Sequence, residues 1–194
     1  MTFQHLFAAL CVAWPLSEFW IGARHRSGKR NEVRDQGTLR RLILTIWLCV
    51  AAGVWLAYCG PAYWSPSAIP APWRRPLLIA GCALMVAGMP LRWWSVHTLA
   101  QFFTIYVAIR EGHRLIRSGP YRLLRHPSYT GALMTFWGFA LALGSWPALP
   151  VVILPVTAAF LWRMRIEEHV LSEAFPAEYP AYARETRRLI PYLW

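Results

Sequence analysis

Charged side chains are scarce in this sequence, and acidic ones are scarcer still. Of its 194 residues only 15% are charged, whereas soluble domains usually carry about 25%. Nine acidic residues stand against twenty basic ones, and 57% of the chain is apolar. Whether this composition excludes a water-soluble fold depends on whether the apolar residues are dispersed or gathered into long runs.

Two kinds of site are also missing from the sequence. The four cysteines form no CxxC pair and have no histidine at ligand spacing, which argues against a metal centre. They lie in or beside apolar runs, so we expect them to be small buried hydrophobic residues. No glycine-rich strand-to-helix turn is present, which argues against a Rossmann-type nucleotide site.

The apolar residues are gathered into long runs. Residues 42–60, 76–91 and 127–162 contain no charged side chain. A bilayer core about 30 Å thick needs roughly 20 mostly apolar residues per helix. A water-soluble core could hide one such run, but hardly four or five in so short a chain. We therefore predict an all-α, polytopic integral membrane protein with about five transmembrane helices and a cytosolic C-terminal helical region.

The expected helices cover residues 3–22, 41–60 and 76–96 and the two arms of the block 127–162. Several prolines within 60–75 indicate a loop, and Pro90 is expected to kink the third helix. The turn Gly144–Pro147 divides the last block into a hairpin, because 36 residues are too many for one span. Residues 163–194 are expected to form a cytosolic helical tail.

The positions of the basic residues predict the orientation of the chain. Eighteen of the twenty lie on one side of the five expected spans, and Arg74 and Arg75 lie on the other. The positive-inside rule then places the N-terminus outside and the C-terminus in the cytoplasm. A net charge of +11 would suit nucleic-acid binding, but the placement of the charge at the ends of apolar runs argues against it. We expect a single membrane domain, 1–194, with an N-terminal hairpin (1–75) and a core (76–194).

Most of the polar residues with distinctive spacing fall in two cytosolic segments, 112–129 and 163–168. Taken singly, the arginines of the first can be explained as cations that bind lipid headgroups. Glu167 can be explained as a solvated partner of Arg163, one helical turn earlier. Taken together, histidines, tyrosines and a carboxylate pair converge on one face of the membrane. Because an arginine at the end of an apolar span is costly without a partner, this favours the polar floor of a pocket that opens toward lipid.

The segment GHRLIRSGPYRLLRHPSYTG at residues 112–131, with R-x3-EE beginning at Arg163, resembles the isoprenylcysteine carboxyl methyltransferases. It is also similar to the related membrane phospholipid N-methyltransferases. The resemblance covers roughly residues 76–194, and the first two helices match only in being hydrophobic. It implies a five-helix methyltransferase that binds S-adenosylmethionine at its cytosolic face.

Carried over by position, the resemblance implies a cofactor site made of His113, Arg114, Leu115, Ile116, Tyr121, His126, Pro127, Ser128, Tyr129, Glu167 and Glu168. It implies Arg163 and Glu167 as catalytic residues, with Arg163 binding the substrate carboxylate, and no metal. Some members have a cofactor-binding Gln seven residues before the motif histidine. This chain has Tyr106 there, and Gln101 lies further upstream.

The acceptor implied by the resemblance is a lipophilic small molecule or a prenylated substrate, with the carboxylate of a prenylated cysteine or a similar hydrophobic acid as the leading choice. A lipid amine is the alternative within the same chemistry. A nicotinamide-dependent membrane reductase of the sterol reductase type, or a non-enzymatic membrane scaffold, are the alternatives outside it. The sequence leaves the oligomeric state open.

Overall fold

The computed structural model describes residues 2–24, 32–33, 37–59, 69–103, 108–109, 112 and 114–193. The helices are α1 (Phe3–Arg24), α2 (Thr38–Tyr58), α3 (Ala71–Leu99), α4 (Pro127–Ala142), α5 (Ala148–Ala174) and α6 (Glu178–Glu185). Short 3-10 turns, η2 (Ala100–Phe102) and η3 (Gly119–Arg122), follow α3 and precede α4. A two-stranded antiparallel ladder joins β1 (Glu32–Val33) to β2 (Ala108–Ile109).

The predicted all-α membrane architecture is confirmed. Four helices, α1, α2, α3 and α5, are long and apolar enough to cross a bilayer. Helix α4 has only 16 residues, but none of them is charged and it packs between α3 and α5. Helices suit this composition because every backbone polar group within the bilayer must be satisfied inside its own segment.

Two predicted boundaries are wrong. Helix α3 begins at Ala71 rather than near 76, because a proline in the first turn of a helix costs little where the backbone N–H has no intrahelical partner. Helix α5 does not end near Trp162 but continues without a break to Ala174. The charged residues from Arg163 to Glu173 therefore extend the last helix, and the separate C-terminal region begins only after Ala174.

The α3–α4 hairpin is held by close backbone packing at two pairs of glycines. Gly81 lies against Gly138, and Gly88 lies against Gly131. A Cβ added at Gly88 would come within 2.5 Å of the Gly131 carbonyl oxygen. Small residues let membrane helices approach closely, where van der Waals packing replaces the hydrophobic effect.

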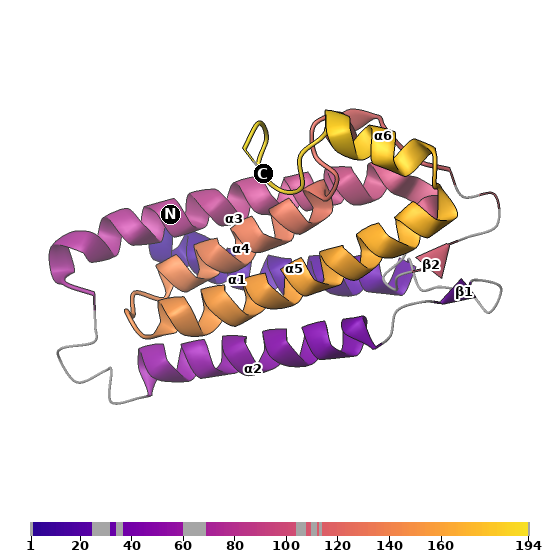
Figure 1. Ribbon diagram of the computed structural model, residues 1–194. Helices are drawn as coiled ribbons and strands as arrows, with labels where there is room; N and C mark the ends of the chain where they lie inside the picture. Colours follow the sequence, from indigo (N-terminus) through magenta and orange to yellow (C-terminus); the bar gives the residue numbers. More distant parts are fainter. Residues whose placement is uncertain are drawn as a thin grey trace.

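The first two helices attach to different partners. Helix α1 packs on α3 and α2 packs on α5. Trp14 of α1 makes an edge-on contact with Phe136 of α4, with ring centroids 4.6 Å apart. Figure 1 shows that the C-terminal ends of α1, α3 and α5 and the N-terminal ends of α2 and α4 share one end of the bundle, where α6 and the β1–β2 ladder also lie. We call this the inner end.

Candidate active site

A cavity of about 600 Å³ lies at the inner end and extends between α1 and α2. Its volume is within the range of about 300–1,000 Å³ that is typical of small-molecule sites. Most of its lining is apolar. Trp14, Phe19, Ile43 and Trp47 line its α1–α2 part, which we call the lipid-side groove. Trp47 is 69% exposed, so this part of the cavity is open toward the surrounding bilayer.

The segment 119–129 forms one wall of the cavity because of its local backbone. Gly119 has a φ of +56°, which starts the 3-10 turn η3 and places Tyr121 in the interior. Pro127 occupies the first position of α4, where its missing N–H costs nothing. His126, at the N-cap, and Tyr129, one turn into the helix, both line the cavity.

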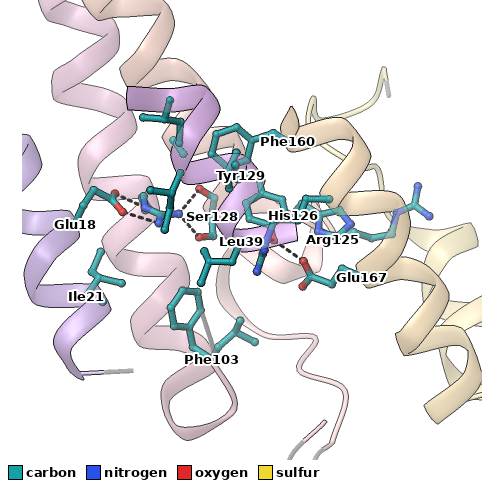
Figure 2. Close-up of a pocket in the computed structure, with 18 of the residues that line it drawn as sticks. Glu18, Ile21, Leu39, Phe103, Arg125, His126, Ser128, Tyr129, Phe160 and Glu167 are labelled. Carbon is teal, nitrogen blue, oxygen red and sulfur yellow. Dashed lines mark hydrogen bonds and ion pairs between the residues drawn. The ribbon is translucent and has the colours of Figure 1, made fainter. Parts of the chain in front are cut away.

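Arg163 lies at the centre of a buried polar chain. Arg163 is only 3% exposed. Its Nε donates to the Tyr129 hydroxyl at 3.0 Å, and its Nη1 donates to the Thr38 hydroxyl at 2.8 Å. The Tyr129 hydroxyl in turn donates to Glu167 Oε2 at 2.7 Å. The guanidinium and the carboxylate are thus linked through a phenol, and Arg163 and Glu167 both line the cavity. Figure 2 shows Tyr129 and Glu167 side by side. Such hydrogen bonds are what make a buried charge tolerable.

A second polar contact in the cavity wall joins α1 to the α3–α4 hairpin. Arg92 of α3 forms a bidentate ion pair with Glu18 of α1, in which Nη2 donates to Oε2 at 2.7 Å. Arg92 Nη1 also donates to the Ser128 hydroxyl at 3.0 Å. In Figure 2 Glu18 lies on the side of the cavity opposite Glu167.

The adjacent glutamates of α5 face different surroundings. Glu167 lines the cavity, whereas Glu168 turns toward the C-terminal segment. Glu168 Oε2 accepts from Arg188 Nη2 at 2.8 Å, and its Oε1 lies 3.2 Å from His126 Nε2 and 3.6 Å from Arg125 Nε.

The structure brings most of the expected site residues to one cavity. Those that line it are Leu115, Ile116, Tyr121, His126, Ser128, Tyr129, Arg163 and Glu167. Three others do not line it: Arg114 is exposed and stacks over Phe102, Pro127 is buried in the first turn of α4, and Glu168 faces Arg188. Gln101 is exposed in η2. His113 and Tyr106 lie outside the described residues.

Tyrosines at the inner end are held in their neutral form. Burial raises the pKa of Tyr121 well above its ordinary value, and the negative charge of Glu167 raises it further. Burial also raises the pKa of Tyr182 to about 12, although Arg125 and Arg117 oppose the shift. The neutral Tyr182 hydroxyl donates to the Tyr121 carbonyl oxygen at 2.8 Å, which fixes the wall that carries Tyr121.

Several cavity residues were missed by sequence reasoning. They are Glu18, Arg92, Arg125, Tyr179 and Tyr182, and Thr38 was missed as the residue that accepts a hydrogen bond from Arg163. Glu18 could have been found, because it is the only acidic residue of the first apolar segment and an ionisable residue inside a span is by default a functional candidate. Thr38 carries no such pattern, because its partner Arg163 is 125 residues away.

Fold and site together define a polytopic helical membrane protein with a polar-ended cavity that is open toward lipid. The chain belongs to the phospholipid methyltransferase family, whose profile matches residues 77–178. This match covers α3 from residue 77 onward, α4 and α5, and leaves out α1 and α2.

Relatives of known name agree with the family assignment. The chain is 32% identical over 117 residues to the protein-S-isoprenylcysteine O-methyltransferase of Saccharomyces cerevisiae, covering 59% of this chain and 49% of that protein. It is 27% identical over 194 residues to a probable protein-S-isoprenylcysteine O-methyltransferase of Oryza sativa subsp. japonica, covering 97% of this chain and 95% of that protein. The chain thus spans about half the length of the yeast protein. These relatives confirm the resemblance inferred from the motifs.

A solved structure shows the same fold. The eukaryotic intramembrane Ras methyltransferase ICMT (isoprenylcysteine carboxyl methyltransferase) superposes with a TM-score of 0.63 at 24% identity. The match covers 76% of this chain and 52% of that one.

Proposed function

We propose that this protein transfers a methyl group from S-adenosylmethionine to the carboxylate of a lipophilic acceptor, with a prenylated cysteine or a similar hydrophobic acid as the preferred class. The observation that carries the proposal is the buried Arg163, which faces a largely apolar cavity open toward lipid. A fixed guanidinium in such surroundings suits a ligand with an anionic head and an apolar chain.

The residues at the inner end suit the methyl donor. S-adenosylmethionine supplies an electrophilic methyl group on a positively charged sulfonium. Glu167 presents a carboxylate to the cavity, where it can balance that charge and accept hydrogen bonds from ribose or amino groups. Leu115, Ile116 and His126 provide apolar and ring surface beside it.

The residues around Arg163 would align the acceptor. The acceptor carboxylate is already ionised at neutral pH, so no strong base is required. Thr38 and Tyr129 hold the guanidinium in place from α2 and α4, which restricts the position of a carboxylate bound to it. Catalysis would rest on alignment of the reacting atoms and exclusion of water. The apolar chain of the acceptor would lie in the lipid-side groove.

The names of the relatives support the same acceptor class, since the yeast protein is a protein-S-isoprenylcysteine O-methyltransferase. The family description, by contrast, names phospholipids. A lipid amine is therefore the second candidate acceptor. It is disfavoured because the buried Arg163 guanidinium on this cavity repels a protonated amine but attracts a carboxylate.

The test is methyl transfer from labelled S-adenosylmethionine by the purified full chain in lipid nanodiscs. We expect labelling of N-acetyl-S-farnesylcysteine and none of its methyl ester or of phosphatidylethanolamine. Arg163→Ala should abolish transfer, whereas Arg165→Ala should not, because Arg165 is exposed on the same helix and does not line the cavity. Labelling of phosphatidylethanolamine alone would replace the acid acceptor by the amine. NADPH binding without binding of S-adenosylhomocysteine would overturn the proposal.

A further inference from the structure

The segment that follows α6 runs alongside the cavity wall at residues 123–130. The Arg125 N–H donates to the Arg187 carbonyl oxygen at 2.7 Å, and the His126 N–H donates to the Arg188 carbonyl oxygen at 3.1 Å. The Arg187 N–H returns a bond to the Leu123 carbonyl oxygen at 3.1 Å. These bonds form a short parallel bridge between Leu124 and Arg187. We call residues 186–189 the C-terminal strap.

The Glu168 carboxylate anchors the strap to α5. Arg188 Nη2 donates to Glu168 Oε2 at 2.8 Å, and Arg188 Nε lies 3.2 Å from Oε1 and 3.1 Å from Oε2, so both carboxylate oxygens accept from the guanidinium. The Glu168 side chain is 12% exposed and that of Arg188 is 35% exposed. A bidentate pair between arginine and a largely buried carboxylate is geometrically specific as well as stabilising. Arg188 therefore fixes both the strap and the orientation of the Glu168 carboxylate.

Glu168 in turn contacts His126, which lines the cavity. Its Oε1 lies 3.2 Å from Nε2 of His126, whose side chain is only 4% exposed. The His126 ring stacks on Tyr129 with an interplanar angle of 8° and centroids 5.5 Å apart. Tyr129 in turn bridges Arg163 and Glu167. Contacts thus run without a gap from Arg188, outside the cavity, to the two residues proposed to act on the acceptor and the donor.

We propose that Arg188 and Glu168 are positioning residues: through the C-terminal strap and His126 they hold the donor side of the cavity in its binding geometry. Glu168 thereby takes a role different from that of the neighbouring Glu167, which touches the cavity itself. The proposal rests on the proposed methyltransferase function for its kinetic consequence, but its structural consequence is independent of that function.

The structural consequence is tested by hydrogen exchange on the full chain in nanodiscs, without donor or acceptor. Arg188→Ala should raise the exchange rates of the Arg125 and His126 amides about tenfold or more, because these amides donate to the strap. Arg187→Ala is the matched control, since its exposed side chain is removed while its backbone bonds stay. Equal exchange at both amides in the Arg188→Ala variant and the wild type would overturn the proposal.

The kinetic consequence is a selective loss of donor affinity. Arg188→Ala and Glu168→Gln should each raise the KM for S-adenosylmethionine and the Kd for S-adenosylhomocysteine about tenfold or more, since small misplacements of binding groups are costly. The acceptor KM should change much less, because Arg163 is also held by Thr38 of α2. Arg188→Lys should give donor constants between those of the wild type and those of Arg188→Ala, because lysine keeps the charge but not the bidentate geometry.

These outcomes separate the two proposals. A general loss of folded protein would lower the amount of active enzyme without changing either KM, and would count against a positioning role. If the wild-type chain bound no S-adenosylhomocysteine, the proposed function would fail, while the exchange experiment would still decide whether the strap holds residues 125 and 126.

Discussion

Arg163 illustrates how a single side chain can be costly in a membrane helix and still be retained. Its Nη1 and Nε donate to residues of different helices, Thr38 on α2 and Tyr129 on α4. An arginine this deeply buried would destabilise the fold if those acceptors were absent. Its position therefore depends on the assembly of three helices, which is consistent with a residue that must be held precisely.

Replacing Arg163 by lysine should separate the effect of its positive charge from that of its hydrogen-bond geometry. Lysine keeps the positive charge but cannot reach Thr38, Tyr129 and a carboxylate at once. We expect kcat/KM for the acceptor to fall by about 10²-fold while the Kd for S-adenosylhomocysteine changes little. Steady-state kinetics measures kcat/KM for the acceptor, and isothermal titration calorimetry measures the Kd for S-adenosylhomocysteine. A donor Kd that rises as much as the acceptor kcat/KM falls would contradict the assignment of Arg163 to the acceptor.

Removing one member of the Glu18–Arg92 pair should destabilise the fold more than removing both. Glu18→Gln would leave the Arg92 guanidinium without its carboxylate, at a cost on the order of 2 kcal/mol, below the fully buried range because the Glu18 side chain is 33% exposed. Thermal unfolding in nanodiscs should show a lower Tm.

The double variant Glu18→Leu with Arg92→Met provides the control for that prediction. Apolar residues of similar volume remove both charges at once, so the Tm should return toward the wild-type value. A double variant that is less stable than Glu18→Gln would show that the ion pair stabilises the fold beyond neutralising the two charges.

Among the helices, α3 and α4 depend most on glycine for their close packing against each other. Their four interface glycines recur at a spacing of seven residues, 81 and 88 on α3 and 131 and 138 on α4. Because seven residues make two helical turns, each pair lies on one face and the two backbones can meet along it. This contact brings Arg92 of α3 beside Ser128 of α4.

A methyl group at the α3–α4 contact should therefore separate the helices. Gly88→Ala places its Cβ 2.7 Å from the Thr135 hydroxyl as well as against the Gly131 carbonyl oxygen. We expect a loss of about 1–3 kcal/mol, typical of overpacking, measured as a lower Tm. Gly22→Ala is the control, because its Cβ would meet nothing within 4 Å and alanine favours the helix. Equal Tm values for the two variants would contradict this account of the hairpin.

The whole molecule is expected to place its inner end in the cytoplasm, following the distribution of its basic residues. In a bacterial host, alkaline phosphatase fused after Trp194 should be inactive and a fluorescent protein fused there should fluoresce. Phosphatase fused after Cys59, at the far end of α2, should be active. The reverse pattern would place the donor side of the cavity outside the cell and contradict this orientation.

The membrane architecture could be predicted from the sequence because it depends on local pattern. Uncharged runs near 20 residues, such as 42–60, have few alternatives to a helix within a bilayer. The motif at 112–131 likewise indicated the family. The boundaries that failed, at Ala71 and beyond Trp162, failed because prolines and charges at helix ends are compatible with either helix or loop.

Side-chain partnerships across the bundle could not be predicted in this way. Nothing in the local sequence distinguishes Glu167 from Glu168, yet one lines the cavity and the other binds Arg188. Glu18 and Arg92 are 74 residues apart, and Thr38 and Arg163 are 125 apart. Which residues meet depends on how each helix is rotated and how closely its neighbours approach, and these are properties of the packed bundle rather than of any one segment.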